Sequence, residues 1–156
     1  DTVPGRVTGL TLHADKPGVY RGQCAEFCGE QHARMALHVI ALAPDEFDRW
    51  LAKEAQAAAL PSSPLIERGR AAFLEQRCQS CHTIRGVASG ARLGPDLTHV
   101  GGRLHIAAGT LRNHRGALAG WIADPQAIKP GARMPAALDI DGATLQALAA
   151  YLEQLK

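Results

Sequence analysis

The residues Cys78-Gln-Ser-Cys81-His82 constrain this chain more than any other stretch of it. The pattern C-x-x-C-H is the attachment signature of a c-type haem, in which two thiols bind the porphyrin and the following histidine binds the iron. A thioredoxin-like redox pair would need a βαβ setting, and a zinc site would need a second ligand pair downstream. Because neither accompanies the motif, the sequence predicts a covalent haem with His82 as its proximal ligand.

Length and composition limit the remaining possibilities. A chain of 156 residues, 46% of them hydrophobic, can form one ordinary domain or two small ones. Its net charge of +2 is too small to indicate a nucleic-acid partner. The longest apolar run, residues 35–43, is far shorter than the ~20 residues that span a membrane, and no signal-peptide pattern is present.

The first part of the chain has the pattern of β-structure. Residues 1–43 are rich in Gly and β-branched side chains, with turn signals at Pro4-Gly5 and Pro17-Gly18. The predicted strands are residues 7–12, residues 37–42 and a third that includes residues 18–20.

A helical pattern follows. The sequence predicts a helix that begins at Pro44-Asp45, with Asp45 as its N-cap, and runs into the Ala-rich residues 55–59. Residues 60–64, Leu-Pro-Ser-Ser-Pro, have the composition of a linker, which allows either a fixed or a mobile second part. A β-rich part followed by an α-rich part predicts two domains.

A second dense cluster of ligand-type side chains lies in the β-rich part. Cys24, Cys28, His32 and Met35 fall within twelve residues. Two thiolates, an imidazole and a thioether favour copper, because soft sulfur ligands select it and a thioether is a typical weak axial ligand. Zinc would use the thiolates and the imidazole but gains little from Met35. The remaining alternative is a local disulfide between Cys24 and Cys28.

Several segments here carry a family resemblance. They are Val3-Pro-Gly-Arg6, Lys16-Pro-Gly-Val-Tyr20, Gly22-Gln-Cys-Ala-Glu-Phe-Cys-Gly29 and residues 32–35. Together they resemble subunit II of haem–copper cytochrome c oxidases. The resemblance implies a binuclear copper site, CuA, in which Cys24 and Cys28 bridge both coppers and His32 and Met35 each bind one. It also implies that Glu26 contributes its backbone carbonyl and turns its carboxylate toward a magnesium ion shared with subunit I.

The resemblance also shows a departure. The family has a further His ligand upstream of the Val-Pro-Gly-Arg segment, together with a membrane anchor and the first strands of a cupredoxin sandwich. We therefore expect the chain to be the C-terminal part of a larger subunit, with an incomplete copper site and an uncovered sheet face. His13 and His38 do not match the missing ligand, and both are predicted to be surface histidines on strands.

The part after the linker resembles a class I cytochrome c. Pro64 is placed to begin a helix that leads to the haem motif through Arg77. By the resemblance, the carbonyl of Pro95 accepts the second imidazole N–H of His82. Such a hydrogen bond fixes the ring and raises its basicity.

Met134 is the candidate for the sixth iron ligand. It is the only Met after the linker and lies in the Pro- and Gly-containing residues 129–135, outside any helical periodicity. His/Met ligation raises the reduction potential relative to bis-His ligation. The competing residues, predicted to be surface histidines, are His99, His105 and His114.

Two further helices complete the second part. One is predicted over residues 118–124, ended by Pro125, with Trp121 and Ile122 buried. The other is predicted to begin near Asp141 and to pack across the helix before the haem motif. Its predicted buried face is Leu145, Leu148, Ala149, Leu152 and Leu155. By the resemblance, Arg103 and Trp121 lie near the haem propionates.

These expectations combine into one organisation. Residues 1–52 form an all-β, cupredoxin-like part with a trailing helix. Residues 53–64 form a linker. Residues 65–156 form an all-α cytochrome c domain. The order resembles caa3-type oxidases. The resemblance implies a subunit that takes electrons from a cytochrome c or a bc1-type quinol-oxidising complex and passes them through haem c and CuA to the oxygen-reducing subunit I. Its place would be the outer, periplasmic face of a bacterial cytoplasmic membrane.

Three alternatives remain open. The same pair of centres could serve a nitric-oxide or nitrous-oxide reductase, although Glu26 between the cysteines favours an oxidase over a nitrous-oxide reductase. A haem-based sensor would leave the sixth position open. A structural zinc site in the first part would differ in its metal content.

Overall fold

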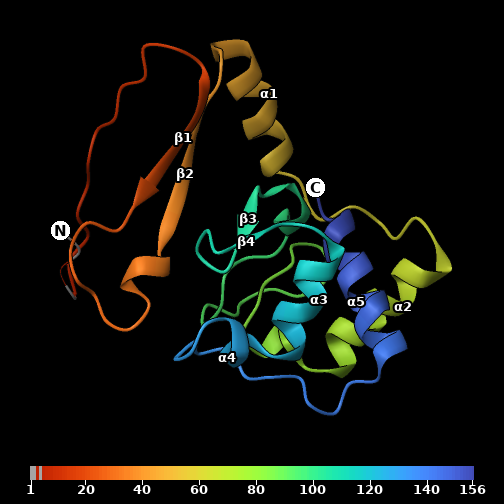
Figure 1. Cartoon of the computed structure of the whole chain (residues 1–156). Coiled ribbons are helices and arrows are strands. Elements are labelled where there is room, and N and C mark those ends of the chain that lie inside the picture. Colours follow the sequence, from red (N-terminus) through yellow and green to blue (C-terminus); the bar gives the residue numbers. More distant parts are fainter. Residues whose placement is uncertain (1–2, 4) are drawn as a thin grey trace.

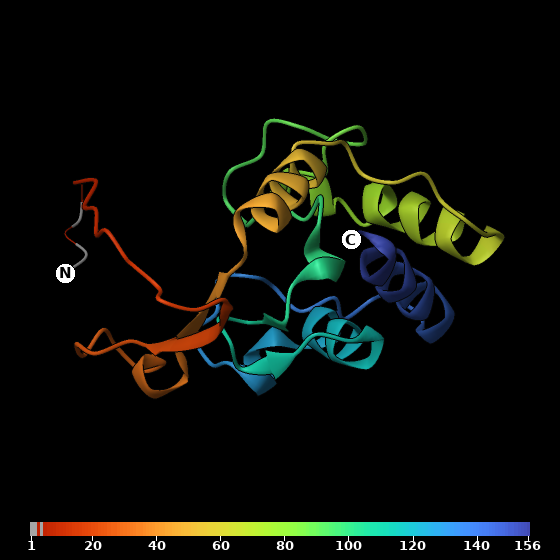
Figure 2. The same ribbon diagram turned by 90° about the horizontal axis from the view of Figure 1, so that it is seen from above.

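The computed structural model describes residue 3 and residues 5–156. Its first part is a two-stranded ribbon with one helix, and its second part is mainly helical (Figure 1). The strands are β1 (Gly18–Gln23), β2 (Ala36–Ala41), β3 (His105–Ile106) and β4 (Leu111–Arg112). The α-helices are α1 (Pro44–Glu54), α2 (Pro64–Glu75), α3 (Arg115–Ala123), α4 (Pro125–Ile128) and α5 (Gly142–Gln154). Figure 2 shows the β1–β2 ribbon and the α2–α5 pair at opposite ends of the molecule.

The ribbon confirms two of the predicted strands and corrects the third. β1 and β2 pair antiparallel from Gly18 opposite Ala41 to Gln23 opposite Ala36, and residues 24–35 connect them. Residues 7–12 form no strand, and Val7 is fully exposed. The prediction was wrong because strand-type side chains form a strand only beside a paired neighbour. Pro4 lies outside the described residues.

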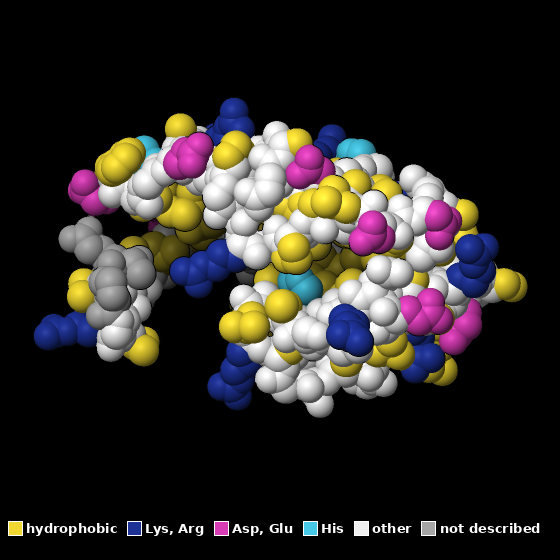
Figure 3. Space-filling model, turned by 90° about the horizontal axis from the view of Figure 1, so that it is seen from below, with side chains coloured by type: hydrophobic (Ala, Val, Ile, Leu, Met, Phe, Trp, Pro, Cys, Tyr) yellow, Lys and Arg dark blue, Asp and Glu magenta, His cyan; other side chains and the backbone are white. Residues whose placement is uncertain are grey.

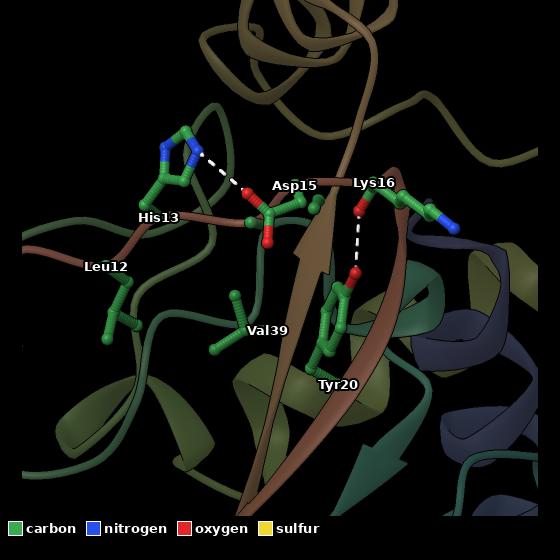
Figure 4. Close-up of a pocket in the computed structure, with 8 residues that line it drawn as sticks. Leu12, His13, Asp15, Lys16, Tyr20 and Val39 are labelled. Carbon is green, nitrogen blue, oxygen red and sulfur yellow. Dashed lines mark hydrogen bonds and ion pairs between the residues drawn. The ribbon is translucent and has the colours of Figure 1, made fainter.

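One face of the ribbon packs on the second part and the other does not. The His38 ring stacks on His105 of β3 with centroids 4.5 Å apart and planes 6° apart, so His38 is not the surface histidine that the sequence predicts. On the opposite face, Tyr20 and Val39 line an open pocket beside residues 12–16 (Figure 4). His13 is exposed there, but it lies on no strand. On this face Tyr20 and Leu37 remain exposed, at 45% and 57%.

The boundaries of α1 differ from the prediction at both ends. Pro44 is its first residue and Ala43 its N-cap, so Asp45 lies inside the first turn. Proline suits the first position because the N–H that it lacks would have no helical partner. The helix ends at Glu54, before the Ala-rich residues, although Ala has the highest helix propensity. Arg85 donates hydrogen bonds there to the carbonyl of Glu54, the last helical residue, and to the carbonyl of Gln56 beyond it.

Helices α2 and α5 cross closely to form the core of the second part. Gly69 of α2 lies against Ala147 and Tyr151 of α5, so that an added Cβ would overlap the Ala147 carbonyl oxygen. Tyr151 and Phe73 are fully buried at this crossing. The core residues are Ala72, Phe73, Ile84, Val100, Leu118, Ala119, Ile122, Leu148, Ala149, Tyr151, Leu152 and Leu155, with Leu145 partly buried against them. The predicted crossing and the predicted apolar face of α5 are confirmed.

The remaining elements refine the sequence-based expectation. The short β3–β4 hairpin was not predicted in a part expected to be purely helical. Helix α3 begins at Arg115, earlier than predicted, because the His114 imidazole caps it by accepting the Ala117 N–H. It ends before Pro125 as predicted, but Pro125 then begins α4, where the Asp124 carboxylate caps the first turn. Among the described residues, no helix is both long and apolar enough to cross a membrane.

The close crossing predicts that Gly69→Ala is destabilising. The added methyl group would overlap the α5 backbone, and overpacking of this kind lowers the free energy of unfolding by about 1–3 kcal/mol. Gly120→Ala in α3 is the matched control, because open space surrounds its added methyl and Ala favours a helix interior by about 0.5–1 kcal/mol. Denaturant unfolding measures both. Equal stability of the two variants would contradict the close crossing.

The N-cap of α5 predicts an acid-dependent stability. The Thr144 hydroxyl, followed by the Thr144 and Ala143 N–H groups, hydrogen-bonds the Asp141 carboxylate and lowers its pKa below 3.8. A lowered folded-state pKa contributes stability above the unfolded pKa, and this is lost as the pH falls through the folded value. Thermal unfolding should therefore lose stability below about pH 4 more steeply in the wild type than in Asp141→Asn, which caps without titrating. Parallel pH profiles would contradict the prediction.

Candidate haem and copper sites

The C-x-x-C-H residues lie on one tight turn after α2. The helix ends at Glu75, before Arg77, which adopts a left-handed conformation with φ of 56°. The 3-10 turn η2 (Cys78–Ser80) follows, and the N–H groups of Cys81 and His82 both donate to the Cys78 carbonyl, at 3.2 and 3.0 Å. The turn therefore holds both thiols and the imidazole in one short, hydrogen-bonded unit.

The His82 ring is fixed by the loop that resembles the proximal loop of cytochromes c. Its Nδ1 lies 2.8 Å from the Pro95 carbonyl oxygen, which confirms the predicted hydrogen bond. With Nδ1 carrying the proton, Nε2 is left as the free ligand atom. Gly94 lies against the ring, because a Cβ added there would be 2.7 Å from His82 Nδ1. Its N–H also donates to the Cys81 carbonyl at 2.8 Å.

Polar side chains hold this loop, and among them the sequence predicted a role only for Arg103. Arg103, predicted to lie near the propionates, donates from Nη2 to the Asp96 carbonyl at 2.7 Å and so braces the residue after Pro95. Burial raises the pKa of Asp96, but hydrogen bonds from Thr98 and the charges of Arg85 and Arg103 outweigh it and leave this pKa lowered. The buried Thr98 marks this bracing network, but its burial appears only in the folded structure and has no pattern in the sequence.

The loop that contains Met134 is braced by Gln126 of α4. The Gln126 amide donates to the carbonyls of Ala132 at 2.6 Å and Met134 at 3.4 Å, and it accepts the Gly131 N–H at 3.0 Å. Met134 is half-buried and packs against the core. Gln126 was missed because nothing in the local sequence marks its partners, which lie up to eight residues away in the loop.

The structure also places Trp121 and the three histidines that compete with Met134. Trp121 is half-buried on α3, rather than fully buried as predicted. The competing histidines each have a structural contact: His99 lies 3.2 Å from the Gln56 carbonyl, His105 stacks on His38, and His114 caps α3.

The donor set of this part fits a c-type haem. Two half-buried thiols suit covalent attachment of the porphyrin, and an imidazole with a free Nε2 and a thioether in a braced loop suit His/Met ligation of the iron. Figure 3 shows one face of the molecule, where hydrophobic side chains line a hollow that contains a histidine side chain. An apolar hollow of this kind suits a porphyrin.

The second cluster lies in the 24–35 loop between β1 and β2. Ligand atoms of Cys24, Cys28 and His32 all lie within 4.8 Å of one another. The two Sγ atoms are 3.6 Å apart, too far for a disulfide but close enough to share a metal at metal–sulfur distances of about 2.3 Å. The Glu26 carbonyl oxygen lies 3.2 Å from Cys24 Sγ, on the side of the cluster that the resemblance assigns to it.

Met35 is held at the other end of this loop. Its carbonyl accepts hydrogen bonds from the Cys24 N–H and the Gln23 side chain, both at 3.0 Å. Its side chain is 37% exposed, and the Glu26 carboxylate is exposed as well. The loop thus brings Met35 opposite Cys24 through the backbone, as the ligand spacing requires. Soft sulfur with imidazole is a donor set that fits copper.

Both clusters contain thiols that hold their protons more firmly than an ordinary thiol. The hydrogen bond with Cys24 is the main cause that raises the pKa of Cys28. Burial raises the pKa of Cys78. A metal that binds Cys24 and Cys28 must displace these protons, so its affinity is expected to rise with pH.

Comparison with known families identifies the second part. Residues 66–156, more than half of the chain, match the family described as cytochrome c. The chain belongs to the cytochrome c family. Residues 1–42 match the family described as cytochrome c oxidase subunit II, periplasmic domain. A cupredoxin-like segment followed by a cytochrome c domain fits subunit II of a caa3-type oxidase, part of an oxidoreductase complex.

Individual relatives agree with this assignment. Cytochrome c oxidase subunit 2 of Alkalihalophilus pseudofirmus is 42% identical over 156 residues, which are 100% of this chain and 45% of that protein. The subunit 2 of Bacillus sp. (strain PS3) is 35% identical over 89% of this chain and 40% of that protein. The chain therefore spans less than half the length of these relatives. A solved structure of cytochrome c2 from Rhodobacter sphaeroides aligns with 56% of this chain and 93% of its own, at 22% identity and a TM-score of 0.40.

The contact between Gly94 and the imidazole predicts the effect of Gly94→Ala. The new methyl group would push the His82 ring away from Pro95, weaken the hydrogen bond and make the imidazole less basic. We expect a raised haem reduction potential and a free energy of unfolding lower by about 1–3 kcal/mol, measured by redox titration and denaturant unfolding. Gly102→Ala is the control, since its methyl would meet only Lys156 Cα, at 3.8 Å. Identical potentials for both variants would refute this role of Gly94.

Proposed function

We propose that this chain is the electron-entry portion of subunit II of a haem–copper oxidase. The observation that carries the proposal is that one chain presents two ligand clusters, each suited to a one-electron metal centre. In the first, the ligand atoms of Cys24, Cys28 and His32 lie within 4.8 Å of one another. In the second, the His82 ring is held by a hydrogen bond to the Pro95 carbonyl. A bound haem and a bound copper pair would supply the one-electron carriers that lead from a donor to the oxygen-reducing subunit I. The chain's own residues hold these carriers rather than act as acids, bases or nucleophiles.

In the haem domain, we assign Cys78 and Cys81 to covalent attachment and His82 to the proximal position. Met134 is assigned to the sixth position. The brace by Gln126 and the hydrogen bond to Pro95 support these assignments, because both hold a ligand rigidly and so limit its movement when the charge of the metal changes. We further assign Arg103 and Trp121 to the surroundings of the propionates.

In the first part, we assign Cys24, Cys28, His32 and Met35 as the residues that would hold a copper pair and make it a one-electron carrier. Glu26 contributes its carbonyl, and its exposed carboxylate is available to a magnesium ion shared with subunit I. The short distance between the two sulfurs supports a shared metal site. The family resemblance implies one further His ligand in the whole subunit.

The proposal includes the setting of the chain. We propose that residues 1–52 and 65–156 are separate domains joined by residues 53–64, and that both lie on the periplasmic side of a bacterial cytoplasmic membrane. The match to a family described as a periplasmic domain supports this location. The proposed partners are subunit I, a donor cytochrome c or bc1-type complex, and the membrane through an upstream anchor.

Metal analysis with optical spectroscopy tests the proposal on the whole subunit, upstream residues included. The wild type should bind haem and a pair of coppers. Cys24→Ser should lose most of the copper and keep the haem bands, because a bridging sulfur is removed. Met134→Leu should keep copper, lose the far-red Met–Fe(III) band and lower the reduction potential.

Other outcomes identify the alternatives. Zinc in place of copper would refute the electron-transfer role of the first part and indicate a structural site. A ferric haem that lacks the Met–Fe band in the wild type would refute Met134 as ligand and favour a sensor. Reduction of nitric or nitrous oxide, without oxygen reduction, by the assembled complex would refute the oxidase.

A further inference from the structure

The 24–35 loop is hydrogen-bonded to the segment that precedes Met134. Gln31 Nε2 donates to the Pro130 carbonyl at 3.0 Å, and Arg34 Nη1 donates to the Ile128 carbonyl at 3.2 Å. Gln31 Oε1 is shielded from solvent and has no hydrogen-bond partner among the described residues. The amide therefore lies inside the contact between the two parts rather than at its rim.

A second contact holds the end of the same loop. The Ala36 N–H donates to the Ala108 carbonyl at 2.9 Å, and the Thr110 hydroxyl donates to the Arg34 carbonyl at 3.1 Å. Gly109 lies so close that an added Cβ would be 2.9 Å from Ala36 Cβ. Residues 31–36 are thus held by two segments of the haem domain, the β3–β4 turn and residues 128–130.

The connection between the two parts is also fixed to the haem domain. The Arg85 guanidinium donates to the Gln56 carbonyl at 3.1 Å, and the Arg85 backbone carbonyl accepts the Ala58 N–H at 2.9 Å. Gln154 donates to the Leu60 carbonyl at 2.9 Å. A connection bound along its length favours the fixed arrangement of the two that the linker composition allows.

The contact joins one ligand loop to the other. Gln31 immediately precedes His32, and Pro130 lies four residues before Met134 in the loop that Gln126 braces. A single hydrogen bond between side chain and backbone therefore links the neighbour of a candidate copper ligand to the segment that carries a candidate iron ligand.

We propose that Gln31 is a positioning residue for electron transfer between the two centres, because its amide docks the 24–35 loop onto residues 128–134. This inference rests on the proposed function, since it requires a haem on one loop and copper on the other. The step that it serves moves one electron: a bound haem loses it, a bound copper pair gains it, and no bond forms or breaks. A fixed contact makes the rate independent of how often the two parts would meet by diffusion.

The test compares Gln31→Leu with Gln146→Leu in the whole subunit. Gln31→Leu removes the amide donor but keeps a side chain of similar volume, whereas Gln146 is exposed on α5, away from the contact. Loss of one hydrogen bond corresponds to a change of about two- to tenfold in a docking equilibrium. We expect Gln31→Leu to speed hydrogen exchange of the Ala36 N–H, which is measurable without bound copper, and to slow haem-to-copper transfer after flash reduction by similar factors. Thermal stability, copper content and the haem spectrum should stay at wild-type values.

A second variant strengthens the test. Gln31→Glu places a carboxylate against the Pro130 carbonyl and should give the larger effect on both measurements. Wild-type exchange and transfer rates in both variants would overturn the positioning role. So would a lowered unfolding temperature with an unchanged transfer rate, which indicates a merely structural residue. A wild-type subunit that binds no haem or no copper overturns the proposed function and this inference together, whereas normal wild-type transfer with insensitive variants overturns the inference alone.

Discussion

The haem site depends first on the hydrogen bond between His82 and the Pro95 carbonyl. A histidine on a tight turn would otherwise rotate about its side-chain bonds, and the free ligand atom would not be defined. The carbonyl fixes both the tautomer and the plane of the ring, and Gly94 allows the loop backbone to approach that plane. The position of one backbone oxygen therefore determines the geometry of the candidate iron ligand.

The Pro95 carbonyl is in turn positioned by Arg85 and its neighbours. The Arg85 guanidinium pairs with Asp96 at 3.3 Å, and its backbone N–H donates to the buried Thr98 hydroxyl at 2.9 Å. The same guanidinium also donates to the carbonyl of Glu54, the last residue of α1, and to that of Gln56 just beyond it. One side chain thus joins the end of the first part to the loop that orients His82. An arginine suits this role because its several N–H donors can serve different acceptors at once.

Sequence reasoning named the candidate ligands but missed the residues that hold them, for a physical reason. Ligand chemistry is written in short spacings such as C-x-x-C-H, where a single turn brings the donors together. Gln31, Arg85 and Gln126 instead bond to backbone carbonyls, and in the case of Gln31 the partner lies 99 residues away. Since every residue has a carbonyl, such a bond leaves no pattern at its far end.

The same distinction explains the fold. Helix α5 was predicted well because Asp141 caps it and its apolar face repeats within its own sequence. The end of α1 and the missing strand at residues 7–12 were not, because each depends on a partner elsewhere: Arg85 at the first, and a neighbouring strand at the second.

Backbone strain in the described residues occurs before the Cys78 turn and in the β3–β4 turn. Apart from glycines, Arg77, Ala107 and Ala108 are the described residues with positive φ, at 56°, 52° and 54°. Each costs of order 1–2 kcal/mol in a left-handed conformation. Arg77 sets the direction of the turn that begins at Cys78, and the two alanines turn the β3–β4 hairpin so that the Ala108 carbonyl meets the 24–35 loop. Strained conformations persist only where surrounding contacts hold them. Their location therefore indicates that stability is lost at two places, where the Cys78 turn begins and where the β3–β4 turn meets the 24–35 loop.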